Sequence, residues 1–478
     1  MSQTNDAEYA QFLLHKQPLH VPCGIKSISG LPDALKPFQR DIVAWALRLG
    51  RAAIFAGTGL GKTLMQLSWA DAIERHMQKP ILIFTPLAVA QQTVREAARF
   101  GVAGVAYAAD QSQVSSRIVV TNYDRAEKFD LSKFGGVVLD ESSIIKAHDS
   151  KTRALMMELC ATVPYRLCCT ATPAPNDYVE LGNHAEFLGV LSAKEMLATW
   201  FVHEGSIRAT SASNHGSKPI ADWRLKGHAE KDFWKWVASW AVMIRHPRDL
   251  GYDEPGYDLP PLNKHQITVK VEHEASIETG TLFPMEARTL QERRAASRSS
   301  VQDRVDAAVN LIDAEPGEQW LVWCNLNDEA DALVESITGA VEVRGTDDPE
   351  DKANRMLAFA DGDIKYMITK PKIAGFGMNW QTCSRIIFVG LNDSFEQVFQ
   401  AIRRCWRFGQ NRPVDVYMIA AETEGAVVAN LEAKEEAYDH MAAQMVDHMK
   451  DLNKRALRGR ESRTAIEHTK SMELPSWM

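Results

Sequence analysis

A glycine-rich segment carries the clearest chemistry in this sequence of 478 residues. The run GTGLGKT follows the apolar run AAIFA and precedes a helical stretch; its relevant residues are Gly57, Thr58, Gly59, Gly61, Lys62 and Thr63. Backbone amides in such a turn, at a helix N-terminus, bind phosphate oxygens. Lys62 would hold the β and γ phosphates of a nucleotide, and Thr63 would ligate Mg²⁺. The strict pattern GxxxxGK[ST] fails only at its first glycine, where Ala56 stands.

Two adjacent carboxylates, Asp140 and Glu141, end the apolar run GVVLDE. A carboxylate at the end of a parallel strand can reach a metal held by Thr63. Asp140 would bind Mg²⁺, often through water, and Glu141 would orient and activate an attacking water. The dipeptide alone also fits a solvated acidic strand end, but its position after the glycine loop favours a nucleotide site.

Two sets of alternating elements could position these residues. Between about 50 and 190, short β-rich apolar runs alternate with helical stretches, and a second such set occupies about 318 to 420. This alternation is typical of βα units around a parallel sheet. The sequence therefore predicts two α/β lobes.

The segments outside these sets are more ambiguous. The stretch from about 190 to 300 reads as an insertion plus linker, with Trp223, Trp234, Trp236 and Trp240. Trp236 and Trp240 are four residues apart, a spacing that favours a helix core over a base-stacking surface. The end of the chain is charged and helical. Its basic residues are Lys450, Lys454, Arg455, Arg458, Arg460 and Arg463. They fit an auxiliary DNA contact, a brace across the lobes or a solvated helix end.

Composition sets broad limits. Apolar residues make up 45% and charged residues 24%, which is typical of a soluble globular protein. We see no run of about 18 apolar residues and no secretory pattern at the N-terminus, so we expect a cytoplasmic protein. The seven cysteines form no CxxC pair, which favours buried thiols over zinc or a disulfide. The net charge of −8 argues against a non-specific coat on nucleic acid but allows a basic cleft.

Seven motifs together resemble the Swi/Snf-type ATPases of helicase superfamily two, from about residue 31 to 420. They are LKPFQR (35–40), GTGLGKT, ILIFTPLAVAQQ, DESSIIK, TATPAPND, GFGMN and QAIRRCWRFGQ. The chain looks like the compact bacteriophage and bacterial branch of that group. The resemblance implies an α/β fold of two RecA-like parallel-sheet lobes, with ATP and Mg²⁺ in the cleft between them and a helical insertion.

The resemblance also assigns roles around the nucleotide. Gln39 would contact the adenine edge, while Thr170 and Thr172 would couple the nucleotide site to DNA movement. Arg404 and Arg407 lie three apart, so we expect them to share a helix face and to point at the γ-phosphate as arginine fingers. Gln400 would frame that helix, and Gly375 and Gln410 are further expected nucleotide contacts.

Further positions match the family's nucleic-acid track, where contacts to the backbone read no sequence. They are Thr85, Pro86, Thr121, Asn122, Lys372, Gly377 and Asn379. The glycines also fit simple turns. Four residues depart from the family pattern: Pro371, Arg403, Trp406 and Phe408.

The sequence thus predicts an ATP-dependent motor on nucleic acid, with duplex DNA as the favoured partner. A strand-separating helicase on single-stranded DNA or RNA, or an ATP-switched DNA-binding regulator, remains possible. The expected units are an N-terminal segment, the first lobe, the insertion with connector, the second lobe, and a C-terminal helix with basic tail, at 1–30, 31–190, 191–300, 301–425 and 426–478.

Overall fold

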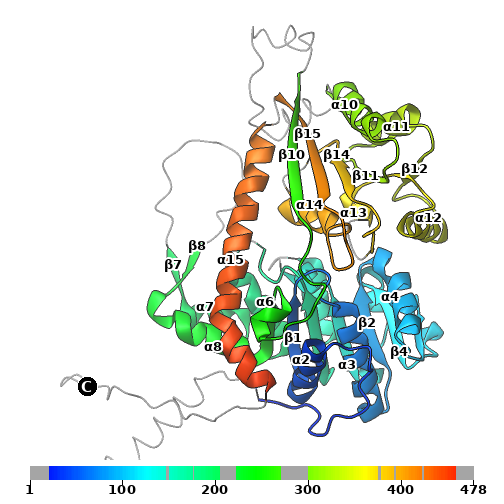
Figure 1. Ribbon diagram of the computed structural model, residues 1–478. Coiled ribbons are helices and arrows are strands. Elements are labelled where there is room, and N and C mark those ends of the chain that lie inside the picture. Colours follow the sequence, from blue (N-terminus) through cyan, green and yellow to red (C-terminus); the bar gives the residue numbers. More distant parts are fainter. Residues whose placement is uncertain are drawn as a thin grey trace, which may run out of the picture.

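The computed structural model contains two α/β lobes stacked one above the other, with one long helix running along both (Figure 1). The residues that the structure describes are 21–146, 150–175, 177–204, 222–270, 300–374, 378–391, 394–422 and 425–458. Every strand pair in the two large sheets is parallel. The predicted fold class is therefore confirmed.

The first lobe contains a seven-stranded sheet in the order β3-β4-β2-β5-β6-β1-β9. Its strands are β1 (Arg51–Ala56), β2 (Ile81–Thr85), β3 (Val105–Tyr107), β4 (Ile118–Asn122), β5 (Gly136–Asp140), β6 (Tyr165–Thr170) and β9 (Ala241–Ile244). The central strands are almost wholly buried apolar runs, because helices cover both faces of a parallel sheet. The carboxyl ends of β1, β5 and β6 consequently meet at one edge.

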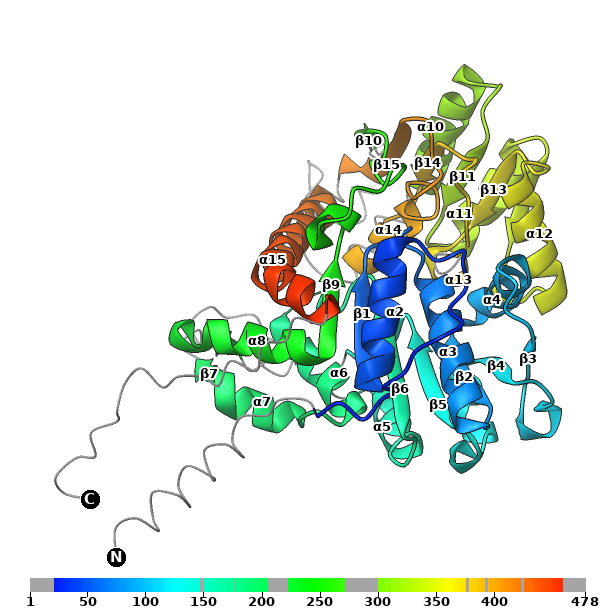
Figure 2. The ribbon, with the colours of Figure 1, turned by 60° about the horizontal axis from the view of Figure 1, so that its bottom comes forward.

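The helices of this lobe are α2 (Pro37–Leu49), α3 (Lys62–Met77), α4 (Leu87–Arg99), α5 (Lys151–Leu159), α6 (Leu181–Leu188), α7 (Ala193–Trp200) and α8 (Glu230–Trp240). Figure 2 shows α2 and α3 side by side on one face of the sheet. Their apolar side chains share one buried cluster with that face of the sheet. The helix that begins at Lys62 is thereby fixed relative to the strands.

The second lobe contains a six-stranded sheet in the order β10-β15-β14-β11-β13-β12. Its strands are β10 (Leu262–Val269), β11 (Trp320–Trp323), β12 (Ala340–Val343), β13 (Tyr366–Thr369), β14 (Arg385–Phe388) and β15 (Val414–Ala421). Its helices are α10 (Val301–Ala314), α11 (Asn327–Ser336), α12 (Pro349–Asp361), α13 (Pro371–Ala374) and α14 (Phe395–Ile402). A fully buried ion pair between Arg304 and Glu329, 2.6 Å apart, ties α10 to α11.

The stretch 191–300, which the sequence presents as an insertion and connector, supplies an edge strand to each sheet. Strand β9 pairs with β1 in the first sheet, and β10 pairs with β15 in the second. Neither strand has a periodic sequence pattern that predicts it, and the parallel partner of each strand lies far away in the chain. The polypeptide between β9 and β10 therefore connects the edge strand of the first sheet to the edge strand of the second.

The tryptophans of this stretch are largely core residues. Trp234, Trp236 and Trp240 on α8 are each at most 2% exposed, which confirms the prediction of a helix core. Trp200 stacks on Trp236, with ring centroids 4.6 Å apart. Trp223 instead lies on β8 (Asp222–Leu225), which pairs antiparallel with β7 (Phe201–Glu204).

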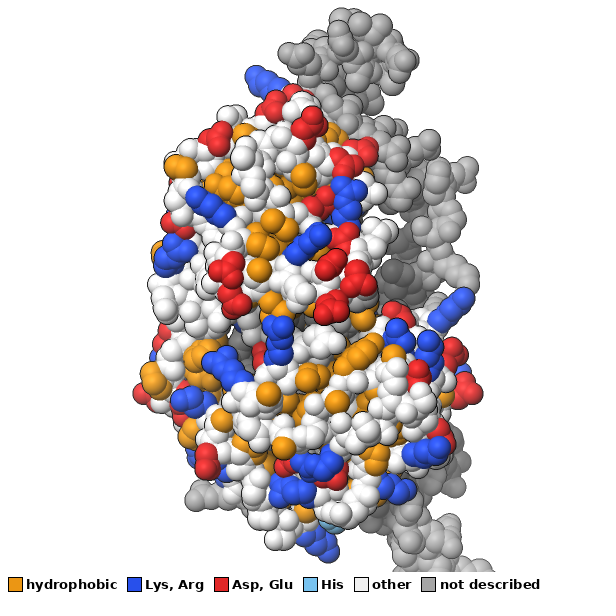
Figure 3. Space-filling view, turned by 90° about the vertical axis from the view of Figure 1, so that its right-hand side faces the viewer, with side chains coloured by type: hydrophobic (Ala, Val, Ile, Leu, Met, Phe, Trp, Pro, Cys, Tyr) orange, Lys and Arg blue, Asp and Glu red, His pale blue; other side chains and the backbone are white. Residues whose placement is uncertain are grey.

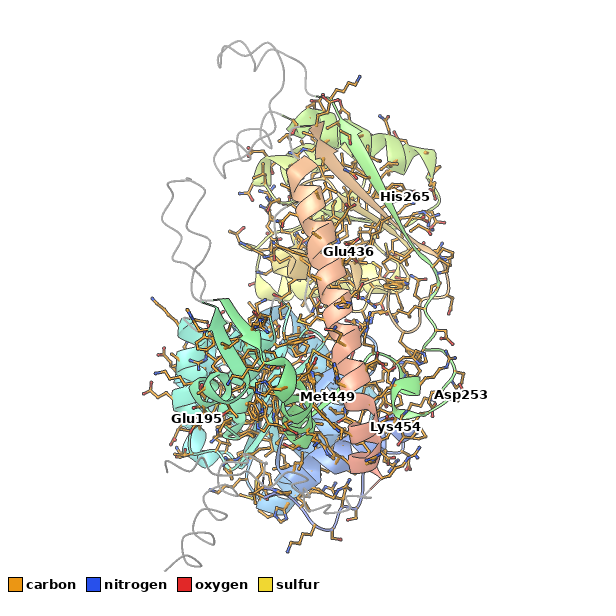
Figure 4. The ribbon with its side chains drawn as sticks, turned by 90° about the vertical axis from the view of Figure 1, so that its left-hand side faces the viewer. Glu195, Asp253, His265, Glu436, Met449 and Lys454 are labelled. Carbon is orange, nitrogen blue, oxygen red and sulfur yellow. The ribbon has the colours of Figure 1, made fainter. Side chains whose placement is uncertain are left out.

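Helix α15 (Gly425–Leu457) is 33 residues long, or about 50 Å, and runs from the second lobe down the side of the first (Figure 4). Near its end, Asn453 and Leu457 are buried against the first lobe. Lys450 and Lys454 pair with Asp447 and Asp451 on the same helix. Arg460 and Arg463 of the basic group lie outside the described residues.

The described cysteines are unpaired, and six of the seven are buried; Cys23 is exposed. Among the described residues, no helix is both long and apolar enough to cross a membrane.

Candidate functional site

The glycine loop lies between β1 and α3 and takes a backbone shape that side chains would obstruct. Gly59 and Gly61 have φ of 88° and 81°, in the left-handed region that glycine adopts without strain. A Cβ on Gly61 would lie 2.3 Å from Gln39 Nε2, and one on Gly59 would lie 2.8 Å from the backbone nitrogen of Phe408. Glycine is therefore required at both positions, because the backbone is left-handed there and neighbouring atoms leave no room for a Cβ. Ala56, in place of the first motif glycine, is the last residue of β1.

Lys62 begins helix α3, and its ammonium reaches back across the loop to donate a 3.0 Å hydrogen bond to the carbonyl of Ala56, the last residue of β1. Burial lowers the pKa of Lys62, while the charges of Glu141 and Asp140 oppose that shift. The cation thus lies inside the loop beside two carboxylates. A bound phosphate would replace the carbonyl as its partner.

Asp140, the last residue of β5, is 6% exposed and accepts a 2.6 Å hydrogen bond from Gln66 Nε2 on α3. Burial, followed by repulsion from Glu141, raises the pKa of this carboxyl to about 7. Tyr123 donates to the backbone carbonyl of Asp140 over 2.6 Å and so fixes the strand end. This buried carboxylate and the Thr63 hydroxyl are hard oxygen donors, which fits the ligand preference of Mg²⁺.

Glu141 follows in a left-handed conformation with φ of 52°, which is unusual for a residue with a side chain. Its carboxylate accepts a 3.3 Å hydrogen bond from the Thr170 hydroxyl, and that hydroxyl in turn accepts one from the backbone N–H of Thr172 at 3.1 Å. The turn after Glu141 is held by His184, whose Nε2 lies 3.1 Å from the Ser142 hydroxyl. Of the two predicted coupling threonines, Thr170 therefore contacts the predicted base, and Thr172 contacts Thr170.

Arg404 and Arg407 approach from the second lobe, but they are not on a helix face as the sequence suggests. Helix α14 ends at Ile402, and the chain then tightens into turns, with the N–H of Arg404 bonded to the carbonyl of Ala401. Both guanidinium groups still converge, since each donates to the carbonyl of Met378, over 3.4 and 3.1 Å. The tight turns bring the two side chains together as the predicted helix would.

The charges of the two lobes meet at this boundary. Burial lowers the pKa of Arg404 to about 10, and it also lowers the pKa of Arg407; the charge of Glu141 opposes the shift in both. The charge of Arg407 also lowers the pKa of Lys62. Contacts between the lobes nearby include an ion pair of Lys146 with Glu396. The structure thus brings all four predicted catalytic residues to one interlobe site.

The predicted glutamines hold protein groups here. Gln39 accepts from the backbone N–H of Lys36 and donates to the carbonyl of Leu60, both over 2.9 Å. Gln400 accepts from Arg404 over 3.0 Å, within the second lobe. Gln410 donates to the carbonyls of Cys383 and Cys405 in the same lobe. Gln39 alone of the three touches the glycine loop.

The predicted nucleic-acid residues fall into two groups. Thr85, Thr121 and Asn122 are at most 5% exposed at strand ends, and within the described chain Thr121 Oγ1 and Asn122 Oδ1 have no hydrogen-bond partner. Asn379 donates to Glu96 of the other lobe over 2.9 Å. Pro86 and Lys372 line a cavity, described next. Gly375 and Gly377 lie outside the described residues.

That cavity, of about 590 Å³, is a groove between the lobes. The first lobe contributes Pro86, Leu87 and Arg95, and the second contributes Lys352 and Lys372, together with the carboxylate of Glu350. Figure 3 shows this side of the molecule, where Lys and Arg side chains lie on both lobes, among Asp and Glu side chains. The groove therefore offers cations from both lobes and an apolar floor.

Two family models match the chain, one over the first lobe, the connector and β10, and the other over most of the second lobe. The SNF2-related domain matches residues 38–274, and the helicase conserved C-terminal domain matches residues 303–409. Together they contain the glycine loop, both carboxylates and both arginines. The chain belongs to the Swi/Snf-type, helicase-like ATPases of superfamily two.

Several relatives of this Swi/Snf-type chain are informative. It is 20% identical over 435 residues to the DNA annealing helicase and endonuclease ZRANB3 of Mus musculus, covering 82% of this chain and 39% of that protein. The chain therefore spans about two fifths of that relative's length. It is 28% identical over 178 residues to putative protein p41 of Acyrthosiphon pisum secondary endosymbiont phage 1, covering 32% of this chain and 38% of that protein. Among solved structures, a Sulfolobus solfataricus SWI2/SNF2 ATPase core in complex with dsDNA aligns with a TM-score of 0.39 and 19% identity, covering 92% of this chain and 98% of that one.

Sequence reasoning did not find three residues that support this site. Gln66 holds Asp140, and His184 holds the turn after Glu141. Tyr438 on α15 donates over 2.9 Å to the carbonyl of Ala171, between the two coupling threonines. Only Gln66 carries a local signal, since it lies one helical turn after Lys62.

Proposed function

We propose that this chain is an ATP-driven motor that translocates along duplex DNA and hydrolyses ATP to ADP and phosphate. The observation that carries the proposal is the composite site: Lys62 and Glu141 in the first lobe face Arg407 in the second. Groups for binding phosphate, activating water and stabilising the transferred charge thus come from both lobes. Hydrolysis at such a site changes how the lobes hold each other.

The chain's own groups divide the chemistry. The amides of the glycine loop and Lys62 bind the β and γ phosphates, and Thr63 with Asp140 would hold Mg²⁺, which neutralises phosphate charge when bound. Glu141 accepts a proton from the attacking water, and its strained backbone keeps the carboxylate aimed at that position. Arg404 and Arg407 give up the Met378 carbonyl and bind the charge that develops on the γ-phosphate.

These steps link chemistry to motion. With ATP bound, the phosphates attract the arginines and draw the lobes together; after phosphate leaves, the attraction is gone. Thr170 touches Glu141, and the neighbouring Ala171 carbonyl is bonded to α15. A change at the nucleotide therefore reaches a helix that runs along both lobes.

The groove between the lobes is the proposed DNA track. Its cations, Arg95, Lys352 and Lys372, suit a phosphate backbone, and their origin in two lobes lets each lobe hold the strand in turn. Nothing in this arrangement reads base edges, so binding is sequence-tolerant. The relatives that are named as helicases favour a DNA substrate.

The test measures steady-state ATP turnover with duplex DNA, single-stranded DNA and RNA at one stated salt concentration. We expect the largest stimulation by duplex, and displacement of a third strand from a DNA triplex as the enzyme moves. Glu141→Gln is the matched control, since it should bind ATP without either activity. Stimulation by single strands alone would favour strand separation, and ATP binding without turnover would favour a switch.

The groove has its own test. Arg95→Ala and Lys352→Ala should each weaken DNA binding at every sequence and lower the salt slope of log Kd by about 1. Lys194→Ala is the charge-matched control, because Lys194 is an exposed lysine on α7 next to Glu195, which Figure 4 labels on another side of the molecule. An unchanged slope in both groove variants would place the track elsewhere.

A further inference from the structure

A pair of aromatic rings lies beside the glycine loop, at a small cavity of about 70 Å³ that opens to solvent. The loop residues Gly57 to Leu60 form one wall, and Tyr257 and Phe408 form another. Phe408 belongs to the second lobe and follows Arg407 directly, whereas Tyr257 belongs to the connector. Groups from three parts of the chain therefore meet at this cavity.

Phe408 leaves part of its side chain exposed beside the glycine loop. It is 41% exposed and is the only exposed Phe, Tyr or Trp among the described residues. One side of its ring contacts Tyr257, with centroids 4.7 Å apart and planes inclined by 34°. The backbone of Phe408 rests on Gly59 closely enough to exclude any side chain there. The exposed ring is thus held beside the phosphate-binding loop.

The aromatic contact continues toward the glutamine that the sequence assigns to the adenine edge. Tyr257 packs edge-on against Phe38, with centroids 5.4 Å apart, and Gln39 is the next residue. Gln39 in turn lies against Gly61 and donates to the Leu60 carbonyl. A planar group on Phe408 would therefore have the phosphate loop at its side, and the Gln39 amide lies against Leu60 and Gly61 of that loop.

We propose that Phe408, backed by Tyr257, is the stacking surface for the base of the bound nucleotide, with the base edge toward Gln39. This inference rests on the proposed ATP site and names its base-recognition element. Stacking on an aromatic face is favourable for any base, and purines offer the larger face. Because Phe408 adjoins Arg407, a base stacked on it also draws the arginine toward the phosphates.

The test compares ATP with inorganic tripolyphosphate, which carries phosphates but no base, by calorimetric titration into the full chain. Phe408→Ala should weaken ATP binding about 10-fold, or about 1.4 kcal/mol, and leave tripolyphosphate binding unchanged. Phe408→Trp should restore ATP binding. The control is Val334→Ala, which truncates another exposed apolar residue, 39% exposed on α11, and should change neither ligand.

The outcomes separate this inference from the proposed function. Equal losses for ATP and tripolyphosphate would overturn the stacking role, because Phe408 would then only shape the glycine loop. Unchanged ATP binding in Phe408→Ala, with binding still lost in Lys62→Ala, would overturn it as well. Failure of the wild-type chain to bind ATP would instead refute the proposed function.

Discussion

Acid should destabilise the first lobe through His184. This side chain is fully buried, with its Nε2 3.1 Å from the Ser142 hydroxyl and its ring edge-on to Phe55 at 5.2 Å. Burial lowers its pKa from the ordinary value of 6.5 to about 4. The folded protein therefore keeps the imidazole neutral at a pH where the unfolded chain would protonate it.

The sign and size follow from proton linkage. A depressed histidine pKa means that the unfolded state binds the proton more readily, so stability is complete above pH 6.5 and falls as the pH drops toward 4. One pKa unit corresponds to about 1.36 kcal/mol, so this single group should cost about 2 kcal/mol between pH 7 and pH 5. The loss of stability should affect the turn that carries Glu141, because His184 contacts Ser142 in that turn.

The assay measures the free energy of unfolding by urea titration at pH 7 and pH 5. His184→Gln places an amide where Nε2 lies, keeps a bond to Ser142 and cannot titrate, so its loss between the two pH values should be smaller by about 2 kcal/mol. His440→Gln is the control, since His440 is exposed on α15 and should lose as much as wild type. Equal acid losses in wild type and His184→Gln would refute the reasoning.

Three further predictions concern the motor. Glu141→Gln should bind ATP with a Kd within a few fold of wild type while hydrolysis stops, measured by nucleotide titration and phosphate release; loss of binding would contradict the division of roles. Combining Arg95→Ala with Lys352→Ala should lower the salt slope of DNA binding by about 2, and an additive effect in filter binding would show independent phosphate contacts. Truncation after Met449 removes the buried Leu457 and should lower the stability measured in a thermal melt by about 2 kcal/mol, while ATP turnover persists. Loss of turnover would show that this end of α15 is needed for hydrolysis.

The predictable part of the molecule is the part written in local sequence. The glycine loop follows from residue type and spacing alone, because it is a backbone structure between a strand and a helix. The two parallel sheets follow from alternating apolar and helical runs. Strands β9 and β10 escape such reasoning, since their assignment to two different sheets is decided by partners distant in the chain.

The support around the site could not be predicted for the same reason. The bond from Gln66 to Asp140 spans 74 positions, the contact of His184 with Ser142 spans 42, and the bond from Tyr438 to Ala171 spans 267. None has a sequence pattern, because each depends on how separate elements pack. The arginine pair shows the converse. The spacing of Arg404 and Arg407 correctly predicted that their side chains converge, but it predicted a helix where the structure has turns.

The most direct test of a shared interlobe site compares Arg407→Ala with Lys62→Ala, measuring ATP Kd and kcat at saturating duplex DNA. Arg407→Ala should keep the Kd within a few fold of wild type and lose about 10³-fold or more in kcat, as expected for a group that acts only on the transition state. Lys62→Ala should lose both binding and turnover. Wild-type turnover in Arg407→Ala would contradict the account, because hydrolysis would then need the first lobe alone.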